Sequence, residues 1–281
     1  MKSFNGDNLL HENGVQMHLK LKAGDVSRYV LTPGDPGRVP IIGKTWEEYH
    51  EMQHNREYRS ASGKYKGIDI SACSTGIGGP STDIAVVELA NVGADTFIRV
   101  GTCAAIQKDI EIGDIIINTG ALRLTGTTDA YIGKEYPAVA NYEIVLALIE
   151  AAEKLNSKYH LGLTASVDSF YAGEVNPISN NFWNSKMENV INDLNAAKVA
   201  CFEMEAATLF VLANILGLRA GSVCIVAANR ITNERNRSLL KVGIEKVCHL
   251  SNEAIKVLAE WDKEKERHGK KYYCPSLESN L

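Results

Sequence analysis

The feature that most constrains the fold is residues 96–107, TFIRVGTCAAIQ, an apolar run that contains one arginine. Aromatic and β-branched residues at its start predict a buried parallel strand, which we expect to end at Gly101, where small residues leave room for a ligand. Burying Arg99 costs free energy unless its guanidinium meets an anion. Two interpretations stay open. Arg99 binds a phosphate or carboxylate at the carboxyl end of the strand, where open α/β sheets keep their ligands, or it pairs with a core Asp or Glu.

Length and charge narrow the class of protein. With 281 residues, 45% of them hydrophobic, the chain can bury one large core, and no Pro/Ser-rich stretch marks a linker. We expect an N-terminal segment over residues 1–26, one domain over 27–262, and a charged, solvated tail over 263–281. A formal net charge of −4 argues against nucleic acid as a partner, so an anionic substrate would need a local group of arginines.

The cysteines and the chain's hydropathy bear on its compartment. Its six cysteines show neither a CxxC pair nor zinc-type spacing, which indicates reduced thiols. Cys103 is interpreted as a packing residue rather than a nucleophile, because no histidine is near it in sequence. The N-terminus lacks the apolar core of a signal peptide, and no apolar run is long enough to span a bilayer. These features predict a soluble cytoplasmic protein with no membrane partner.

Hydrophobic periodicity predicts an α/β chain with glycine-rich turns at strand ends. We expect strands at 28–32, 112–118, 162–166, 199–202 and 220–228, a hairpin-like pair over 66–74, and helices at 46–54, 81–92, 142–155, 205–216 and 241–261. The turn PGDPGR at 33–38 exposes backbone N–H groups that can face an anion beside Arg38, although it is equally an ordinary tight turn. A second glycine-rich loop at 74–81 precedes a helix and lacks the Lys-Ser/Thr of a P-loop.

Polar side chains follow three further strands. Phe170 and Tyr171, with polar residues after them, suit stacking on a flat ring, and a surface loop with a packed Phe is the alternative. Glu203 and Glu205 follow a short strand. We expect one carboxylate to accept from sugar hydroxyls while the other caps or supports the next helix. Arg230 places another arginine at the end of the last core strand.

Five motifs, in order, resemble those of the nucleoside phosphorylases, specifically the uridine phosphorylase branch: PGDPGR at 33–38, STGIGGPS at 74–81, RVGT at 99–102, FEME at 202–205 and NR at 229–230. The resemblance covers most of the chain. It implies a single-domain three-layer α/β/α sandwich with a distorted central β-barrel or mixed sheet, assembled as a hexamer, a trimer of dimers. It also implies a pentosyltransferase of nucleoside salvage that converts uridine and phosphate to uracil and ribose 1-phosphate.

The resemblance implies a role for each matching position. The catalytic residues would be Arg38, Arg99, Glu205 and Arg230. Phosphate would bind to Gly34, Arg38, Arg56, Arg99 and Thr102, with Arg56 supplied by a neighbouring subunit. Ribose would bind to His18, again from the neighbour, and to Thr102, Phe170, Glu203, Met204 and Glu205. The base would meet Cys103, Ala104, Phe170, Glu174, Asn176 and Arg230. Potassium would sit at Glu57, Ile77 and Ser81; phosphate is the co-substrate, and no other cofactor is expected.

The base segment departs from the family pattern at two positions. Uridine phosphorylases usually have Gln and Arg where this chain has Glu174 and Asn176. An ionised Glu only accepts hydrogen bonds and would repel a departing base anion, and losing the Arg removes a donor that would stabilise that charge. Arg230 could compensate, and so could Lys186 if its loop folds inward.

Three alternatives remain beside the uridine phosphorylase interpretation. A purine nucleoside phosphorylase could read a purine edge with Glu174 and Asn176, and Ala227 and Ala228 would make room. However, Asn229 stands where the bacterial purine enzymes have an acidic Asp, so we favour the pyrimidine. A nucleosidase would use water and would not need the arginine cluster. A non-catalytic nucleoside-binding homologue would have little use for a complete phosphate site.

Overall fold

The computed structural model describes residues 11–277, so the N-terminal residues 1–7, in which no signal peptide is expected, lie outside it. Besides a small hairpin of β1 (His11–Glu12) and β2 (Val15–Gln16), the described chain forms one 11-stranded sheet. Its strands are β3 (Tyr29–Pro33), β4 (Glu48–Asn55), β5 (Tyr58–Tyr65), β6 (Ile68–Cys73), β7 (Thr96–Ala105), β8 (Ile115–Leu124), β9 (Ala138–Val139), β10 (Tyr159–Val167), β11 (Cys201–Glu203), β12 (Arg219–Asn229) and β13 (Glu234–Arg235).

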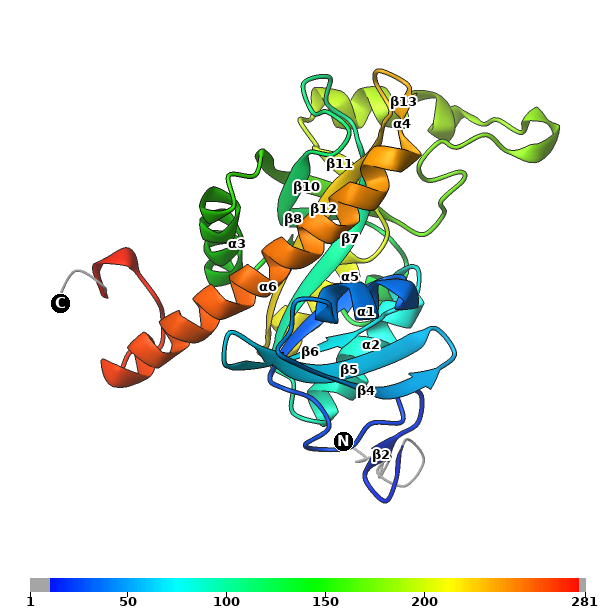
Figure 1. Cartoon of the computed structure of the whole chain (residues 1–281). Coiled ribbons are helices and arrows are strands. Elements are labelled where there is room, and N and C mark those ends of the chain that lie inside the picture. Colours follow the sequence, from blue (N-terminus) through cyan, green and yellow to red (C-terminus); the bar gives the residue numbers. More distant parts are fainter. Residues whose placement is uncertain (1–10, 278–281) are drawn as a thin grey trace.

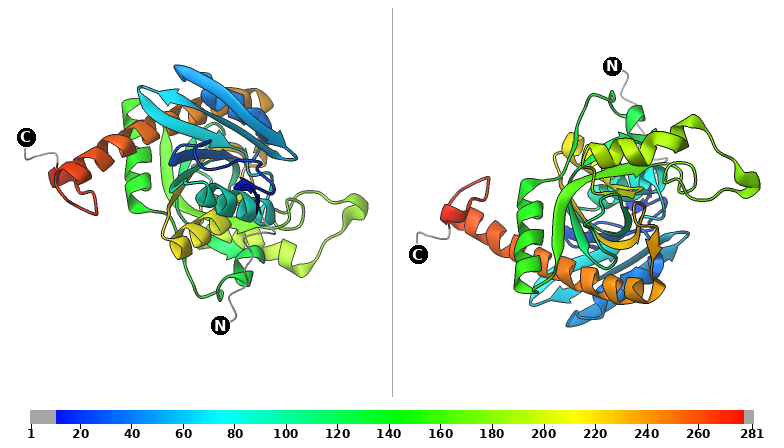
Figure 2. Two further views of the ribbon diagram at one scale, coloured as in Figure 1. Left: turned by 90° about the horizontal axis from the view of Figure 1, so that it is seen from below. Right: turned by 90° about the horizontal axis from the view of Figure 1, so that it is seen from above.

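Helices cover both faces of the sheet (Figures 1 and 2). They are α1 (Val39–Gly43), α2 (Gly79–Asn91), α3 (Tyr142–Lys154), α4 (Ser185–Ala196), α5 (Ala206–Leu216) and α6 (Arg237–Arg267), with 3-10 turns η2 (Pro36–Arg38), η3 (Thr127–Ala130), η4 (Ser179–Asn181) and η5 (Pro275–Leu277). Within residues 11–277, no helix combines the length and the apolar character that crossing a membrane requires.

Five strands close into a central barrel. β7 pairs in parallel with β12, β12 runs antiparallel to β8, β8 and β10 are parallel, and β11 joins β10 back to β7. On its other side β7 pairs with β3, from which β6, β5 and β4 extend the sheet (Figure 1). This architecture confirms the mixed α/β fold with a distorted barrel that the resemblance implies.

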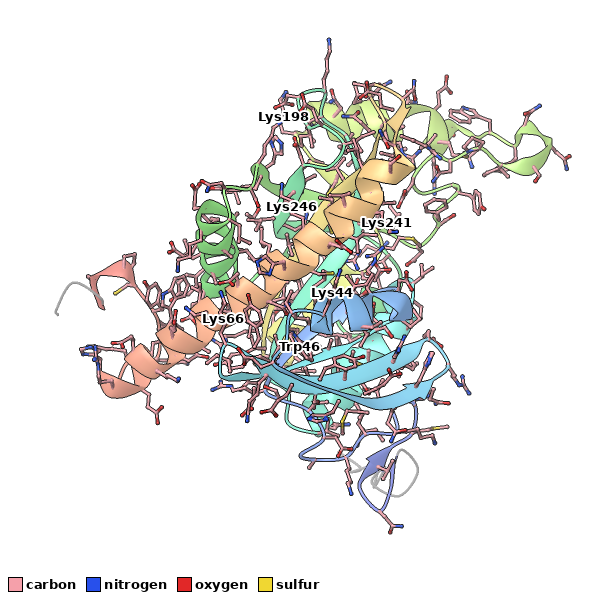
Figure 3. All side chains as sticks on the ribbon, in the orientation of Figure 1. Lys44, Trp46, Lys66, Lys198, Lys241 and Lys246 are labelled. Atoms are coloured by element: carbon pink, nitrogen blue, oxygen red, sulfur yellow. The ribbon has the colours of Figure 1, made fainter. Side chains whose placement is uncertain are left out.

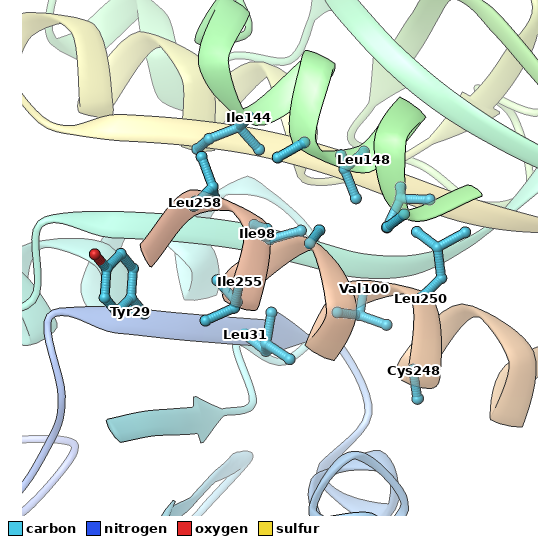
Figure 4. Close-up of a cluster of buried hydrophobic side chains, with 14 of the residues drawn as sticks. Tyr29, Leu31, Ile98, Val100, Ile144, Leu148, Cys248, Leu250, Ile255 and Leu258 are labelled. Atoms are coloured by element: carbon cyan, nitrogen blue, oxygen red, sulfur yellow. The ribbon is translucent and has the colours of Figure 1, made fainter. Parts of the chain in front are cut away.

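The largest core cluster lies between α6, α3 and the barrel strands. Figure 4 shows Leu31 and Ile98 on neighbouring strands, facing Ile255 and Leu258 of α6. Each of these side chains is fully buried, which contributes roughly 1.5–3 kcal/mol per residue. A second cluster joins α2 and α5 on the opposite face. The two clusters hold β7, and with it Arg99, between two layers of helix.

The expected helix over residues 46–54 is wrong, because these residues lead into strand β4. Glu48–Asn55 pairs antiparallel with Tyr58–Tyr65 along its whole length, and this pairing overrides the helix propensity of its Glu, Met and Gln residues. Trp46 lies just before the strand, between β5 and α6 (Figure 3), where its indole N–H donates to Asn252 Oδ1 at 3.0 Å.

The central strand also continues past the expected break at Gly101. β7 runs to Ala105 because β12 pairs with it throughout, with Gly101 opposite Cys224. A Cβ at position 101 would lie 2.7 Å from Cys224 Sγ and 2.9 Å from Arg99 Cζ. Glycine is therefore needed to make room for the Arg99 guanidinium, and it does not end the strand.

The C-terminal region is not a solvated extension over its whole length. Helix α6 continues to Arg267, and Lys265 is buried with its ammonium 2.7 Å from Glu143 Oε2. Beyond the helix the chain folds back, so that Tyr273 stacks on Trp261 with ring centroids 4.0 Å apart. Charge alone predicted exposure, but buried ion pairs and an aromatic stack hold this segment on the domain.

Candidate active site

Two adjoining cavities collect most of the residues that the resemblance singles out. The larger, about 250 Å³, is lined by Gly34, Asp35, Arg38, Ile77, Arg99, Thr102, Phe170, Glu174, Glu203, Met204 and Glu205. The smaller, about 190 Å³, is lined by Thr102, Cys103, Ala104, Phe170, Glu174, Asn176, Ala227, Ala228, Arg230 and Arg235. Thr102, Phe170 and Glu174 line both. Apart from His18 and Arg56, the expected phosphate and ribose residues thus line the larger cavity, and the expected base residues line the smaller one.

Arg99 lines the larger cavity from its buried position on β7. Its Nε donates to Glu203 Oε2 at 2.8 Å, and its Nη2 lies 2.6 Å from Glu205 Oε2. Burial alone would lower the pKa of Arg99, but the two carboxylates outweigh it and raise that pKa. The two interpretations of Arg99 therefore do not exclude each other, since the side chain pairs with core carboxylates and also lines a cavity.

The two glutamates of the FEME motif divide their work. Glu203 is fully buried, and its Oε2 accepts from the backbone N–H groups of Glu205 and Ala206, so it caps α5. Its other oxygen accepts from Ser166 Oγ. Glu205 Oε1 accepts from Gly78 N at 2.6 Å. Burial raises the pKa of Glu205, and the Arg99 charge opposes that rise. The expected division into one capping and one cavity carboxylate is confirmed for the cap, which is Glu203.

Arg38 is the least satisfied charge in the larger cavity. Its Nη1 makes only a long contact of 3.4 Å to Val100 O, and its Nε is buried with no hydrogen-bond partner within residues 11–277. Burial, together with repulsion from Arg99, lowers the pKa of Arg38. Arg38 and Arg99 thus bring two guanidinium groups to one cavity, and the N–H at Arg38 Nε has no partner in the described chain. An anion bound there would stabilise both positive charges.

Charged pairs organise the smaller cavity. Arg230 Nη2 lies 3.1 Å from Glu174 Oε2, and both side chains are largely buried. Burial raises the pKa of Glu174, and Arg230 opposes that shift. Arg230 Nε is a second buried donor with no hydrogen-bond partner in the described chain. The carboxylate at position 174 therefore has a positive partner before any ligand arrives.

Arg235 is a cavity residue that sequence reasoning missed. Strand β13 pairs antiparallel with the end of β12, which places Arg235 opposite Ala228. From there Arg235 Nη2 donates to Asn176 Oδ1 at 2.9 Å, while Asn176 Nδ2 donates to Phe170 O at 2.5 Å. The available signal was the second arginine shortly after Arg230 in the motif NRITNER.

The remaining base-cavity residues are small or aromatic. Burial raises the pKa of the Cys103 thiol, which agrees with a packing residue rather than a thiolate nucleophile. Ala104, Ala227 and Ala228 line the same wall. Phe170 borders both cavities and is 48% exposed, so one face of its ring is open to a ligand.

His18 and Arg56 line neither cavity. His18 Nδ1 lies 2.6 Å from Glu88 Oε1, on α2. Arg56 occupies the turn between β4 and β5 with φ +56°, is exposed, and makes no side-chain hydrogen bond within the described residues. One copy of the chain therefore does not bring these two side chains to its own cavities.

The residues expected to hold potassium lie beside the larger cavity. Ser81 Oγ donates to Ile77 O at 3.1 Å, and a Cβ at Gly76 would lie 2.7 Å from Glu57 Cγ and 3.0 Å from Ser81 Oγ. The group offers a carboxylate, a carbonyl and a hydroxyl oxygen, which are donors suited to a hard cation.

Several residues with expected effects on the base lie elsewhere. Lys186 is exposed near the start of α4 and lines a separate groove. Asn229 is fully engaged, since its amide donates to Gln107 O and Ile110 O and its Oδ1 accepts from Ile231 N. Lys186 therefore does not compensate at the base cavity.

Comparisons with known proteins agree with the geometry. The family model described as "Phosphorylase superfamily" matches residues 28–258. Over 266 residues the chain is 57% identical to a uridine phosphorylase of Thermococcus kodakarensis, covering 95% of each chain. It is 41% identical over 220 residues to a guanosine phosphorylase of Halorubrum lacusprofundi (78% of this chain, 86% of the relative), and 38% identical over 225 residues to a uridine phosphorylase of Escherichia coli (77% and 87%). Because the family model covers most of the chain and these relatives match it over more than two thirds of its length, this chain belongs to the phosphorylase superfamily.

Proposed function

We propose that the protein is a uridine phosphorylase, a pentosyltransferase in which phosphate attacks C1′ of uridine. The C1′–O bond to phosphate forms as the bond from C1′ to N1 of uracil breaks, and the electron pair leaves with the base. The sugar passes through a state with oxocarbenium character, so the enzyme must place phosphate, clamp ribose and stabilise the departing anion. The similarity to uridine phosphorylases along nearly the whole chain supports the pyrimidine as the base.

The observation that carries the proposal is Arg38 beside the buried Arg99, with the Nε of Arg38 buried and without a hydrogen-bond partner within residues 11–277. Phosphate between these guanidinium groups would receive charge-assisted hydrogen bonds and would remove their mutual repulsion. Gly34 and Thr102 line the same part of the cavity. A nucleosidase, which activates water, has no need for this arrangement.

Ribose and base would occupy the neighbouring spaces. Glu205 is held between Gly78 N and Arg99 with lone pairs left for sugar hydroxyls, and Met204 and Phe170 supply apolar walls. Glu203 would hold Arg99 and the start of α5 in place. Arg230 lies where negative charge develops on the base.

The test is base release from uridine, thymidine, inosine, adenosine and guanosine, each with and without phosphate. We expect phosphate-dependent release of uracil to be fastest. Faster release of guanine would assign the chain to the activity named for its Halorubrum relative, and release without phosphate would overturn the role of the arginines.

We also propose a homo-oligomer, a hexamer built as a trimer of dimers, in which His18 and Arg56 complete a neighbour's site. Both side chains lie away from their own cavities, and Arg56 has no partner within the described chain.

Subunit mixing tests this arrangement. Arg38→Ala and Arg56→Ala proteins, unfolded and reassembled together, should regain about a quarter of the activity by random pairing. Arg38→Ala mixed with Arg99→Ala should regain none, because both losses fall in the same half-site.

We further propose that the protein binds potassium at a subunit interface and that it is cytoplasmic. The oxygen atoms of Glu57, Ile77 and Ser81 would share a potassium ion with a second subunit. Replacing potassium with tetramethylammonium should then lower the temperature at which the oligomer dissociates, and Glu57→Gln should abolish that difference. All six cysteines are unpaired, which supports a reducing compartment.

A further inference from the structure

The smaller cavity, where the base would bind, is lined by more charged side chains than recognition of a neutral pyrimidine requires. Glu174, Arg230 and Arg235 line a space of about 190 Å³. Their formal charges sum to one positive charge. A carboxylate alone would repel a departing base anion, but here two guanidinium groups outweigh it. The repulsion expected from Glu174 is therefore not the net field that a leaving base would meet.

The contacts show which atoms are already used. Asn176 Oδ1 accepts from Arg235 and Asn176 Nδ2 donates to Phe170 O, so the amide is fixed at both ends. Glu174 uses Oε2 for Arg230, and its Oε1 has no hydrogen bond within residues 11–277. Arg230 Nε is buried and unpartnered, and Arg235 uses Nη2 alone for Asn176. One acceptor oxygen and donors from two arginines remain for a ligand.

These free atoms match the edge of uracil. Uracil presents a carbonyl, the N3–H and a second carbonyl, so it needs one acceptor and donors on both sides. Guanine presents one carbonyl beside two N–H donors, so it needs two acceptors, and adenine presents no carbonyl. A site with one free carboxylate oxygen and two guanidinium groups therefore favours the pyrimidine.

We propose that Arg235 is a specificity-determining residue of the base subsite, donating to the C4 carbonyl of uracil while Glu174 accepts from N3–H, and that Asn176 positions Arg235. This inference rests on the proposed function. The donor missing from position 176 would thus be supplied from β13, which the pairing with β12 brings to the same cavity. Arg235 lies at the exposed rim, so its effect should be moderate.

The experiment compares Arg235→Met with wild-type protein on uridine and on the pyrimidin-2-one riboside, which lacks the second carbonyl and the N3–H. The matched control is Arg267→Met, an exposed arginine at the far end of α6. We expect Arg235→Met to lower kcat/KM for uridine about 10-fold through loss of a charge-assisted hydrogen bond. It should leave the KM of phosphate unchanged and the pyrimidin-2-one riboside nearly unaffected, so that the preference for uridine falls about 10-fold while the contact of Glu174 with N3–H remains. Arg267→Met should change nothing.

Asn176→Ala, alone and combined with Arg235→Met, tests whether Asn176 acts by positioning Arg235 or by contacting the base itself. Because Asn176 acts through Arg235, the double variant should be no slower on uridine than Arg235→Met alone. If Arg235→Met melts far below wild type, Arg235→Gln, which keeps a donor without the charge, decides by the same ratio of nucleosides. An equal fall on both nucleosides, or no fall, would overturn the inference while leaving the proposed function intact. A wild-type protein that releases no uracil would overturn the proposed function itself.

Discussion

The phosphate end and the base end of the site are built in different ways. At the phosphate end, Arg99 and Glu203 lie on core strands, are almost fully buried, and are tied to each other and to the backbone. At the base end, Glu174 and Asn176 follow β10 in a loop, and Arg235 lies on a two-residue strand at the rim. The first end fixes the chemistry in a rigid frame. The second end can change its side chains without disturbing the core, which is where this sequence departs from the uridine phosphorylase pattern.

The largest effect should come from Arg38→Ala at the rigid end. Losing an unpartnered guanidinium that faces phosphate should lower kcat/KM for phosphate about 10²- to 10³-fold. Steady-state kinetics with phosphate varied at saturating uridine measures it, with Arg267→Met as the control. A fall of the same size in kcat/KM for uridine, with kcat/KM for phosphate unchanged, would place Arg38 at the nucleoside.

Glu205→Gln should have a smaller effect, about 10²-fold on kcat, because the amide keeps one acceptor but loses the ion pair with Arg99. The matched variant is Glu203→Gln, whose carboxylate caps α5. That change should mainly destabilise the fold, by about 3 kcal/mol in chemical unfolding. If both variants lost activity and stability alike, the division of work between the two glutamates would be wrong.

At the adaptable end, the pH profiles of kcat/KM for uridine should differ between the wild-type protein and Glu174→Gln. Burial raises the pKa of Glu174 above its ordinary value of 4.5, so its carboxylate takes up a proton at a higher pH than an exposed glutamate does. As the pH falls through this raised pKa, Glu174 becomes protonated and the acceptor for N3–H is lost, so kcat/KM for uridine should fall. Glu174→Gln cannot titrate, so its acid limb should move to lower pH, while activity at neutral pH changes less than about 10-fold. An unchanged acid limb would assign the titration to another group.

The smallest effect on activity should come from Asp262→Asn, far from both cavities. Burial would raise the pKa of Asp262, but hydrogen bonds from Arg219 and Lys265 lower it well below its usual range. A lowered folded-state pKa contributes stability above the unfolded pKa, and this stability is lost as the pH falls. Asp262→Asn should therefore lower the free energy of unfolding by about 2 kcal/mol at pH 7, with the difference shrinking below about pH 4. Uridine turnover at neutral pH should be unchanged.

The sequence predicted the rigid end better than the adaptable one. At the rigid end, the site residues belong to short motifs in or just after strands, and the structure brings them to one cavity: Gly34, Arg38, Arg99 and Glu205. Arg235 carried no such motif, because its place depends on β13 turning back along β12. The helix expected over 46–54 failed for the same kind of reason, since strand pairing with a distant partner outweighed local propensity.

By itself, the sequence determined the α/β class, most of the core strands and turns, and the candidate anion-binding arginines, because apolar runs, glycines and isolated arginines are local properties. Tertiary structure decided which charges meet. Closure of the barrel through β11 and β12 sets Glu203 and Glu205 on Arg99, and the return of β13 sets Arg235 on Asn176. These pairings join residues between about 60 and 100 positions apart, and no local pattern encodes contacts over such separations.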